Sequence, residues 1–372
     1  MEKVILTGSV PPPYHGSSIY FENLLNSEIR NVFEIHHLDI SDHRNLDNLS
    51  RLDSTNVYIA LKSIANLVLL LRKVKPGLVY IPVASNYLPF LRDGLFILAT
   101  SYFSKAKIIV HLHEGSYFRE VFYNNSFGLY KRFINYVLGK VSTAIVFTEG
   151  LKSNFKGLVK NTVAFPNGIK QEYTAGFKPA DENRNIRVNY LGNLFESKGI
   201  LDILSAAEIV TRKYKNVEFN FAGAWSEKEE STKNKALKFI EEKNLRRYVN
   251  FKGVVTGEGK RKFLSDTDIL VFPTWYPYEG CPLVIIEAMS CSVPVISTND
   301  AGAIPEMIIN GKTGILTDKK NPAQLAEAII SLISNKNLRE KIGNSGREYY
   351  LNNFTMEINI KNIINTFYKA LD

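Results

Sequence analysis

The chain has 372 residues, more than one typical hydrophobic core requires, so we expect two domains. Hydrophobic residues make up 45% and aromatic residues 12% of the sequence, which is typical of a folded globular protein and argues against a disordered one. No uninterrupted apolar run of about 18 residues occurs, so a membrane-spanning helix is not expected. Met1 leads directly into the strand-like segment Val4–Leu6, and no signal peptide is expected.

The net charge of +9 is unevenly distributed along the chain. Residues 1–170 contain 19 Lys and Arg against 12 Asp and Glu, a balance of +7, and the remaining 27 against 25 give only +2. A basic first half is suited to an anionic membrane surface or a phosphate-bearing acceptor, although an ordinary solvated surface explains it equally well. No nucleic-acid-binding motif accompanies the charge. The only cysteines, Cys281 and Cys291, argue against a disulfide framework or a zinc site and fit a reducing cytoplasm.

The first half alternates between strand-like and helix-like segments. Residues 4–7 read as a strand, residues 8–16 as a proline-rich loop, and a helix is expected from Ser17. A loop between the first strand and the first helix is where open α/β sheets bind ligands, although these residues alone favour a plain turn. The alternation predicts a doubly wound parallel sheet. The expected elements further on are a strand at 57–60, a helix at 61–73, a strand at 78–81, a helix at 90–103 and strands at 107–110 and 144–148.

Two histidines follow the strand expected at 107–110. Alternation along the strand would place His111 and His113 on one face of the sheet. The end of a parallel strand is a catalytic location, but a histidine packed at the sheet edge and a zinc ligand pair are alternatives. No third zinc ligand is evident in the sequence. Residues 116–140 then mix Tyr and Phe with basic residues, which is typical of a helix that packs on the sheet with a basic outer face.

The second half contains the stretch with the clearest chemistry. A buried strand is expected at Asp268–Phe272, followed by a loop and then by a helix at Leu283–Met289. Glu279 lies before this helix and Glu287 lies within it. Free N–H groups at a helix start bind diphosphate oxygens, and carboxylates accept hydrogen bonds from sugar hydroxyls. Spacing alone leaves open the alternative of an ordinary strand–loop–helix with two surface glutamates.

Residues 265–268, Ser-Asp-Thr-Asp, contain a D-x-D pattern of the kind that holds a metal in some transferases. Because Asp268 opens a strand, we interpret this pattern as structural. Gly311-Lys-Thr313 resembles the end of a phosphate loop, but Glu306 stands where that loop requires glycine.

Several separated motifs occur together in one order. They read EGCPLVIIEAM from Glu279, PVIST from Pro294 and AGAIPEMIINGKTGILT from Ala301, and they resemble the retaining glycosyltransferases of family 4, also called group 1. The resemblance covers nearly the whole chain and is densest at 189–318. It implies the GT-B fold, an α/β architecture with two Rossmann-like doubly wound domains facing across a cleft and a C-terminal helix crossing back to the first.

The domain boundaries follow from this resemblance. We expect an acceptor-binding domain at 1–170, a linker at 171–186 and a nucleotide-sugar-binding domain at 187–354, with the crossover helix at 355–372 packing on the first domain. Residues 116–140 would then lie on the acceptor side, in possible contact with a membrane. Closure of the two domains over substrate is also expected.

The resemblance also assigns roles to individual residues. His113 would line the reaction centre, Glu279 would orient donor sugar hydroxyls, and Glu287 would bind the ribose. Lys198 would bind the diphosphate, and the main chain near Val254 would line the base. The full set of expected donor-binding residues is Gly16, Gly192, Asn193, Lys198, Val254, Gly280, Cys281, Pro282, Leu283, Val284 and Glu287.

The chain departs from the family pattern at four positions. Asn193 stands where the family has Arg, which removes one cation from the expected diphosphate clamp or transfers that role to another cation. His15 and Ala301 each stand where relatives often have a glycine next to Gly16 and Gly302, and Ser292 also replaces a usual glycine.

The expected function is sugar transfer with retention, from a nucleoside diphosphate donor to a glycan or lipid-linked acceptor in bacterial surface polysaccharide synthesis. No metal or other cofactor is expected, nor a nucleic-acid partner. The protein is expected in the cytoplasm, with possible peripheral contact at the inner face of the plasma membrane. A sugar-nucleotide epimerase or hydrolase of the same fold is the enzymatic alternative, and a catalytically inactive nucleotide-binding relative is the alternative outside enzymes.

Overall fold

The computed structural model describes residues 1–12, 16–42, 54–171 and 184–372. His15 and most of the linker predicted at 171–186 lie outside these residues. The chain divides into two compact units. Unit 1 consists of residues 1–167 and 357–372, and unit 2 consists of residues 168–356.

Unit 1 is built on one fully parallel sheet with strand order β2-β1-β3-β4-β5-β6. Its strands are β1 (Lys3–Gly8), β2 (Glu34–Asp39), β3 (Leu78–Val83), β4 (Lys107–Leu112), β5 (Thr143–Val146) and β6 (Asn161–Ala164). Its helices are α1 (Gly16–Leu25), α2 (Ile29–Val32), α3 (Ser54–Val74), α4 (Tyr87–Phe103), the π-helix η2 (Phe118–Tyr123), α5 (Gly128–Leu138), the 3-10 helix η3 (Gly150–Phe155) and α13 (Met356–Leu371).

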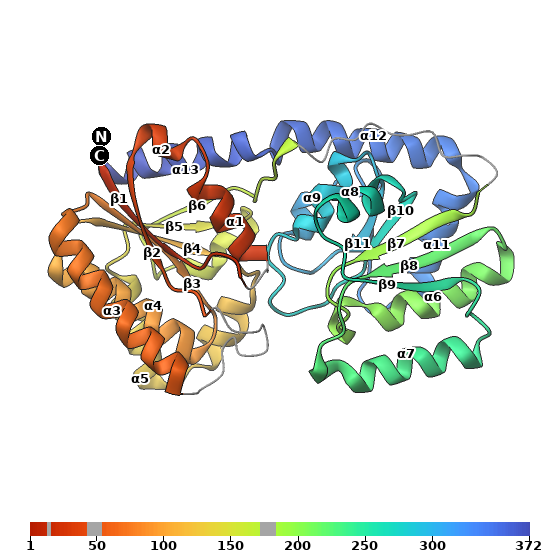
Figure 1. Cartoon of the computed structure of the whole chain (residues 1–372), viewed down its shortest axis with the longest axis horizontal. Helices are drawn as coiled ribbons and strands as arrows, with labels where there is room; N and C mark the ends of the chain where they lie inside the picture. The colour runs from red at the N-terminus through yellow and green to blue at the C-terminus, as the bar shows by residue number, and fades with distance from the viewer. Residues whose placement is uncertain (13–15, 43–53, 172–183) are drawn as a thin grey trace. The chain divides into compact units, whose positions relative to one another are not determined.

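The sequence dictates this sheet through short apolar runs that are buried along their length. In β3 the residues 78–81 are inaccessible to solvent, as expected for a strand covered on both faces. Parallel neighbours require crossover connections, and the intervening segments supply them as helices, with α4 packing against both α3 and α5 (Figure 1). The last helix, α13, also packs in unit 1, where the ring of Phe367 lies 5.7 Å from Phe33 and 6.1 Å from Tyr80.

The strand expected at 57–60 is wrong, because these residues belong to α3. The run of β-branched and aromatic residues suggested a strand. In the structure Val57, Ala60, Leu61 and Ile64 line one cavity, which is the spacing of a single helix face. Both edges of β1 are already occupied by β2 and β3, so the segment has no strand partner there.

Unit 2 repeats the parallel design with strand order β12-β11-β10-β7-β8-β9. Its strands are β7 (Ile186–Leu191), β8 (Val217–Ala222), β9 (Val249–Gly253), β10 (Ile269–Phe272), β11 (Val295–Thr298) and β12 (Ile315–Thr317). Its helices are the 3-10 helices η5 (Glu196–Lys198) and η6 (Glu227–Glu229), and α6 (Ile200–Lys213), α7 (Glu230–Glu242), α8 (Gly257–Ser265), α9 (Leu283–Ser290), α10 (Ile304–Met307), α11 (Pro322–Ser334) and α12 (Lys336–Asn353).

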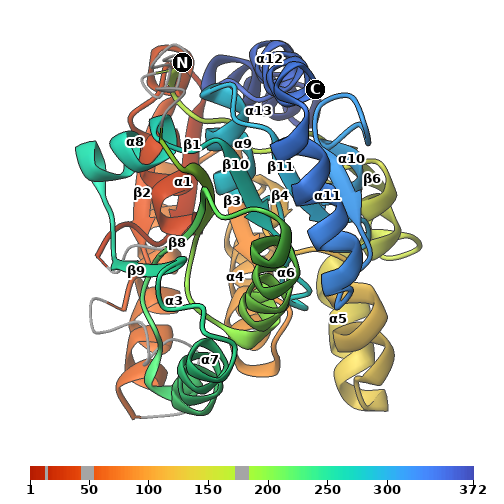
Figure 2. The ribbon, with the colours of Figure 1, turned by 90° about the vertical axis from the view of Figure 1, so that its right-hand side faces the viewer.

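The helices of unit 2 form two groups. α6 packs against both α7 and α11, and Figure 2 shows α6 and α11 side by side. α9 packs against α12. The strand order reverses direction between β7 and β10, and the crevice outside the carboxyl ends of the strands at such a switch point is where open α/β sheets bind ligands. Among the described residues, no helix is both long enough and apolar enough to cross a membrane.

Candidate active site

The loop between β10 and α9 holds Glu279 in a defined network. The side chain is buried, with 7% of the residue exposed. Its Oε2 atom lies 2.6 Å from the Nζ atom of Lys198 and accepts a hydrogen bond of 2.8 Å from the hydroxyl of Thr274. Two residues that the sequence assigned separately to the diphosphate and to the sugar are therefore in direct contact, although they are 81 positions apart.

A glycine after β7 makes the position of Lys198 possible. Gly199 has a φ of +80°, and a Cβ atom there would lie 2.4 Å from the carbonyl oxygen of Pro273. Only glycine accommodates both this conformation and this close approach. The tight turn places Lys198 against the loop that follows β10, with its ammonium 4.5 Å from the centre of the Tyr276 ring.

A second glycine presses on the same loop from the other side. Gly302 has a φ of +54°, and a Cβ atom there would lie 2.3 Å from the carbonyl oxygen of Glu279 and 2.5 Å from that of Gly280. The next residue, Ala303, donates its N–H to the Gly280 carbonyl at 2.8 Å. The loop bearing Glu279 is therefore held by backbone packing. Gly280 itself is not among the described glycines with a positive φ.

Glu287 lies in α9 and is 4% exposed. Its Oε1 atom is 2.6 Å from the Nζ atom of Lys260 in α8. Its Oε2 atom is shielded from solvent and has no hydrogen-bond partner in the part of the chain that the structure describes. A buried acceptor left in this way costs free energy, so it marks a place where a donor from a ligand would fit.

The helix start predicted between these two carboxylates is present. Pro282 is the N-cap of α9, and Leu283 and Val284 begin the first turn, whose N–H groups have no carbonyl four residues earlier within the helix. Cys281 is buried, with its Sγ atom 3.7 Å from the sulfur of Met307, so only its main chain could serve a ligand.

The remaining predicted donor residues lie at the ends of strands and helices. Gly192 follows β7 with a φ of +152°, and Asn193 is exposed, with its carbonyl accepting a hydrogen bond of 2.7 Å from Tyr190. Val254 follows β9 and is 67% exposed. Gly16 begins α1 in unit 1, and no described atom lies within 4 Å of where its Cβ would be. Among the described residues, none of these four forms a hydrogen bond or ion pair with the pairs around Glu279 and Glu287.

The predicted histidine pair lies at the end of β4 in unit 1. The two rings stack with centroids 4.0 Å apart, as expected for two residues on one strand face. The hydroxyl of Tyr80, from β3, lies 2.6 Å from Nδ1 of His111 and 3.4 Å from Nε2 of His113. Tyr20 packs against both rings. One phenol thus links the buried histidine to the half-buried one.

Burial decides the protonation of this group. Desolvation lowers the pKa of His111 well below its usual value, and the nearby His113 lowers it further, so His111 is neutral. Desolvation likewise raises the pKa of Tyr80. Among the described residues there is no cluster of three or more His, Cys, Asp or Glu that could hold a metal ion.

Next to His113 lies a buried carboxyl group, that of Glu114, for which the sequence suggested no role. Glu114 lines two cavities of unit 1, of about 470 and 180 Å³, and its shielded Oε2 atom has no hydrogen-bond partner among the described residues. Burial raises the pKa of Glu114 to about 7, and nearby Asp93 adds to the shift. Asp93 is itself buried and paired with Arg92 at 2.7 Å. The smaller cavity also includes His113, so the cavities end beside the predicted reaction centre.

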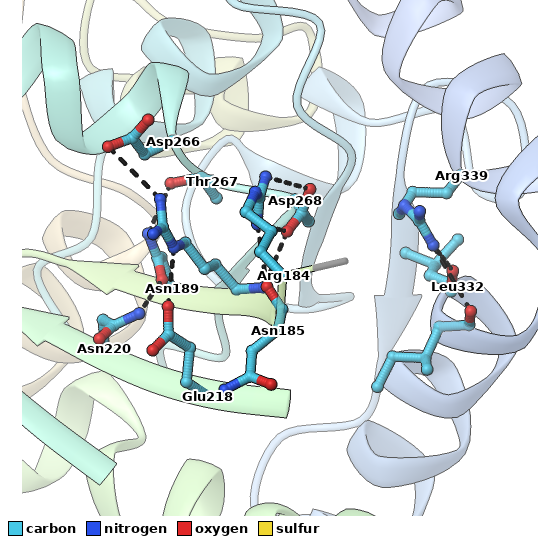
Figure 3. Close-up of polar contacts among 12 residues, drawn as sticks. Arg184, Asn185, Asn189, Glu218, Asn220, Asp266, Thr267, Asp268, Leu332 and Arg339 are labelled. Atoms are coloured by element: carbon cyan, nitrogen blue, oxygen red, sulfur yellow. Dashed lines mark hydrogen bonds and ion pairs between the residues drawn. The ribbon is translucent and has the colours of Figure 1, made fainter. Parts of the chain in front are cut away.

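The two carboxylates of the D-x-D pattern form ion pairs with arginines, which is consistent with a structural role (Figure 3). Asp268 accepts two hydrogen bonds from the guanidinium of Arg184, at 2.6 and 3.0 Å, and one from the Arg187 N–H at 2.8 Å. Asp266 lies 3.4 Å from the Arg187 guanidinium. These pairs precede β10, at the end of the strand opposite to the loop that carries Glu279.

Lys260, Tyr80 and Glu114 are the residues that sequence reasoning missed. Lys260 stands in a run of three basic residues that looks like a solvated helix face, and Tyr80 reads as an ordinary buried strand residue. Only Glu114, which directly follows His113, carried a local signal.

Comparisons with known proteins bear on the fold and on the family of the chain. Residues 175–349 match the family model described as Glycosyl transferases group 1. The capsular polysaccharide biosynthesis glycosyltransferase CapM of Staphylococcus aureus is 28% identical over 332 residues, which cover 83% of this chain and 82% of that protein. A poly(ribitol-phosphate) alpha-N-acetylglucosaminyltransferase of Staphylococcus aureus is 26% identical over 264 residues, covering 70% of this chain and half the length of that protein.

Solved structures share the fold along the whole chain. HepE from Anabaena, in complex with UDP, superposes with a TM-score of 0.76 at 16% identity and covers 99% of this chain and 100% of its own. A glycosyltransferase from Rickettsia africae gives a TM-score of 0.80 at 17% identity and covers 100% and 99%. Both carry the two-domain α/β architecture seen here. Residues 175–349 are therefore similar to the glycosyl transferases group 1 domain, and the chain as a whole has the two-domain α/β architecture of the GT-B fold.

Proposed function

We propose that this glycosyltransferase transfers a sugar, with retention of the anomeric configuration, from a nucleoside diphosphate to a lipid-linked glycan of a bacterial surface polysaccharide. The observation that carries the proposal is the pair of buried glutamates around the start of α9, each matched to one lysine. The functions named for the relatives, capsular polysaccharide biosynthesis for CapM and N-acetylglucosaminyl transfer to poly(ribitol-phosphate) for the second protein, support the polymer context.

Unit 2 binds the donor in this proposal. The diphosphate contacts Lys198 and the first-turn N–H groups of Leu283 and Val284, which carry the positive end of the helix dipole. An ammonium has three donors, so Lys198 can keep its contact with Glu279 and still bind a phosphate oxygen. Glu279 accepts hydrogen bonds from donor sugar hydroxyls, and Glu287 accepts one from the ribose.

Unit 1 supplies the acceptor site and His113. The half-buried imidazole, linked through Tyr80 to a neutral His111, is supported in one orientation and lines the reaction centre. Gly16 leaves open space next to the start of α1, which suits close approach of a phosphate. Catalysis rests on stabilising the charge that develops on the leaving diphosphate. The proposal assigns no step to a metal ion.

A peripheral membrane contact fits the surface of unit 1. Most exposed large apolar side chains that the structure describes belong to this unit, and the balance of +7 lies in residues 1–170. α5 carries both aromatic and basic side chains, and just beyond its end the Lys140 ammonium lies 4.7 Å from the Tyr136 ring centre. Such a surface suits the interface of an anionic bilayer.

The test of the donor site is a thermal-shift panel with UDP, GDP, ADP and CMP, each with and without EDTA. A ligand at about 100 times its dissociation constant stabilises the native state by roughly 2.7 kcal/mol. We expect one nucleotide to raise the Tm, with no effect of EDTA. No shift with any nucleotide would contradict the proposed donor site.

The test of the reaction follows with sugar derivatives of the nucleotide that binds. Transfer should be lost in His113→Ala without loss of nucleotide binding, because the proposal gives His113 no contact with the nucleotide. Proton NMR of the product should show the anomeric configuration of the donor. An inverted product would contradict retention and leave the transferase assignment intact.

A further inference from the structure

The two oxygens of the Glu287 carboxylate have different surroundings. Oε1 is held at 2.6 Å by the ammonium of Lys260, whose side chain is 23% exposed. Oε2 is shielded from solvent and lacks a hydrogen-bond partner within the described chain. The carboxylate is thus fixed through one oxygen and left open through the other.

Lys260 differs from its neighbours on α8. The helix begins Gly-Glu-Gly and continues Lys260-Arg261-Lys262. Arg261 pairs with Glu258 of the same helix at 3.2 Å, and Lys262 is exposed. Of these three consecutive cations, only Lys260 reaches across to α9 and contacts a buried carboxylate.

We propose that Lys260 is a positioning residue for the nucleotide ribose, which fixes Glu287 so that its Oε2 atom accepts a hydrogen bond from one ribose hydroxyl. This inference rests on the proposed function, because that function assigns the ribose to Glu287. The ligand is a ribonucleoside diphosphate. Glu287 accepts a hydrogen bond from one ribose hydroxyl only, and its two oxygens do not bind both vicinal hydroxyls.

The physical reason is the cost of a buried charge. A carboxylate that loses contact with water needs a counter-charge or several hydrogen bonds. Lys260 supplies the charge at Oε1 without covering Oε2. A neutral side chain of similar length would fill the same space and leave Glu287 uncompensated, so the carboxylate would be a poorer and less fixed acceptor.

The experiment compares ribose discrimination in matched variants. Isothermal titration calorimetry measures the Kd of UDP, GDP, ADP and CDP for the wild-type chain, and then of the 2′-deoxy and 3′-deoxy forms of the nucleotide that binds most tightly. The variants are Lys260→Met, Lys260→Gln, Lys260→Arg and, as the control, Lys262→Met. The control removes an exposed cation from the same helix and changes the net charge equally.

We expect the wild type to bind the ribonucleotide about tenfold more tightly than one of the two deoxy forms, because a hydrogen bond to a charged group is worth about that factor. In Lys260→Met and Lys260→Gln this ratio should fall to near one, with the loss confined to the ribonucleotide. Lys260→Arg should retain most of the ratio, and Lys262→Met should leave it unchanged.

Other outcomes overturn the inference in distinguishable ways. An equal loss for ribo and deoxy forms would show that Lys260 acts on the site as a general charge or as packing. An unchanged ratio in Lys260→Met and Lys260→Gln would show that Glu287 is positioned without it. If the wild type binds no nucleotide, the proposed function fails together with the inference, whereas binding without discrimination removes only the inference. The use of two neutral variants guards against one that does not fold.

Discussion

The two units differ in how they accommodate buried ionisable groups at the carboxyl ends of their parallel strands. In unit 2 the buried carboxylates at the carboxyl end of the sheet each have a lysine, Lys198 for Glu279 and Lys260 for Glu287. In unit 1 the corresponding region holds His111 and Glu114, whose pKa values are shifted chiefly by desolvation. Near this region of unit 1, Arg92 forms an ion pair with Asp93.

This difference indicates different tasks. Opposite charges in contact hold fixed positions, which suits a donor whose diphosphate, ribose and sugar must be aligned. Groups that are neutral because they are buried can change protonation when a ligand replaces solvent, which suits the side that receives an acceptor hydroxyl. Separate substitutions can test the ion pairs of unit 2 and the buried carboxyl group of unit 1.

The largest effect is expected from breaking a pair in unit 2. Glu279→Gln keeps the size of the side chain but removes the charge that faces Lys198 and the proposed contact with the sugar. Sugar transfer should fall about 100-fold, the scale of losing one preorganised charge-stabilising contact. The measurement is the initial rate with the nucleotide sugar identified by the binding panel.

A suitable control for this variant is Glu218→Gln, at the glutamate labelled in Figure 3, which breaks its 2.7 Å contact with Arg187. That glutamate precedes the carboxyl end of β8, so transfer should stay near the wild-type rate. If both variants lost activity equally, the loss would reflect stability of unit 2 and the special role of Glu279 would be refuted.

A smaller effect is expected from Glu114 in unit 1, where a substitution should raise stability at neutral pH rather than lower activity. Its pKa is raised from 4.5 to about 7 in the folded chain, so the folded state binds more protons than the unfolded state between these values. Stability therefore declines as the pH rises from about 4.5 to about 7, because the buried carboxyl must ionise. Glu114→Gln removes this decline.

The measurement is the Tm of both forms from about pH 4 to about pH 9, a range that spans the ordinary pKa of Glu and the raised value. The wild type should lose stability relative to Glu114→Gln as the pH rises through this window, and the two curves should run parallel above about pH 8. A constant difference at every pH would mean that Glu114 does not titrate within the window and that desolvation does not govern unit 1.

The smallest effect concerns the backbone of unit 2. Ser292 has a φ of +56°, at a position where the family resemblance leads us to expect glycine. The left-handed conformation costs a non-glycine residue about 1–2 kcal/mol, and the extra chain entropy of glycine offsets part of this. Ser292→Gly should therefore raise the free energy of unfolding by about 1 kcal/mol or less, measured by urea denaturation. A loss of stability would indicate that the serine hydroxyl compensates for the strain.

Local sequence patterns determined most of the architecture. The apolar runs at 78–81, 108–110 and 269–272 lie in strands, and the segments expected to be helical at 90–103 and 283–289 lie in helices. These segments are predictable because burial on both faces of a parallel sheet demands consecutive apolar residues. The strand prediction at 57–60 was wrong because β-branched and aromatic residues in a helix can produce a similar short apolar run.

Tertiary structure alone decided which charges meet. The sequence singled out Lys198, Glu279 and Glu287, but it contained no indication that Lys198 contacts Glu279 or that Lys260 contacts Glu287. These pairs join residues 81 and 27 positions apart. The geometry of the first pair also depends on glycines at 199 and 302 that let backbone segments touch. Likewise, the raised pKa of Glu114 follows from burial, which a sequence does not display. Local pattern sets which elements form, and long-range packing sets the surroundings of each charge.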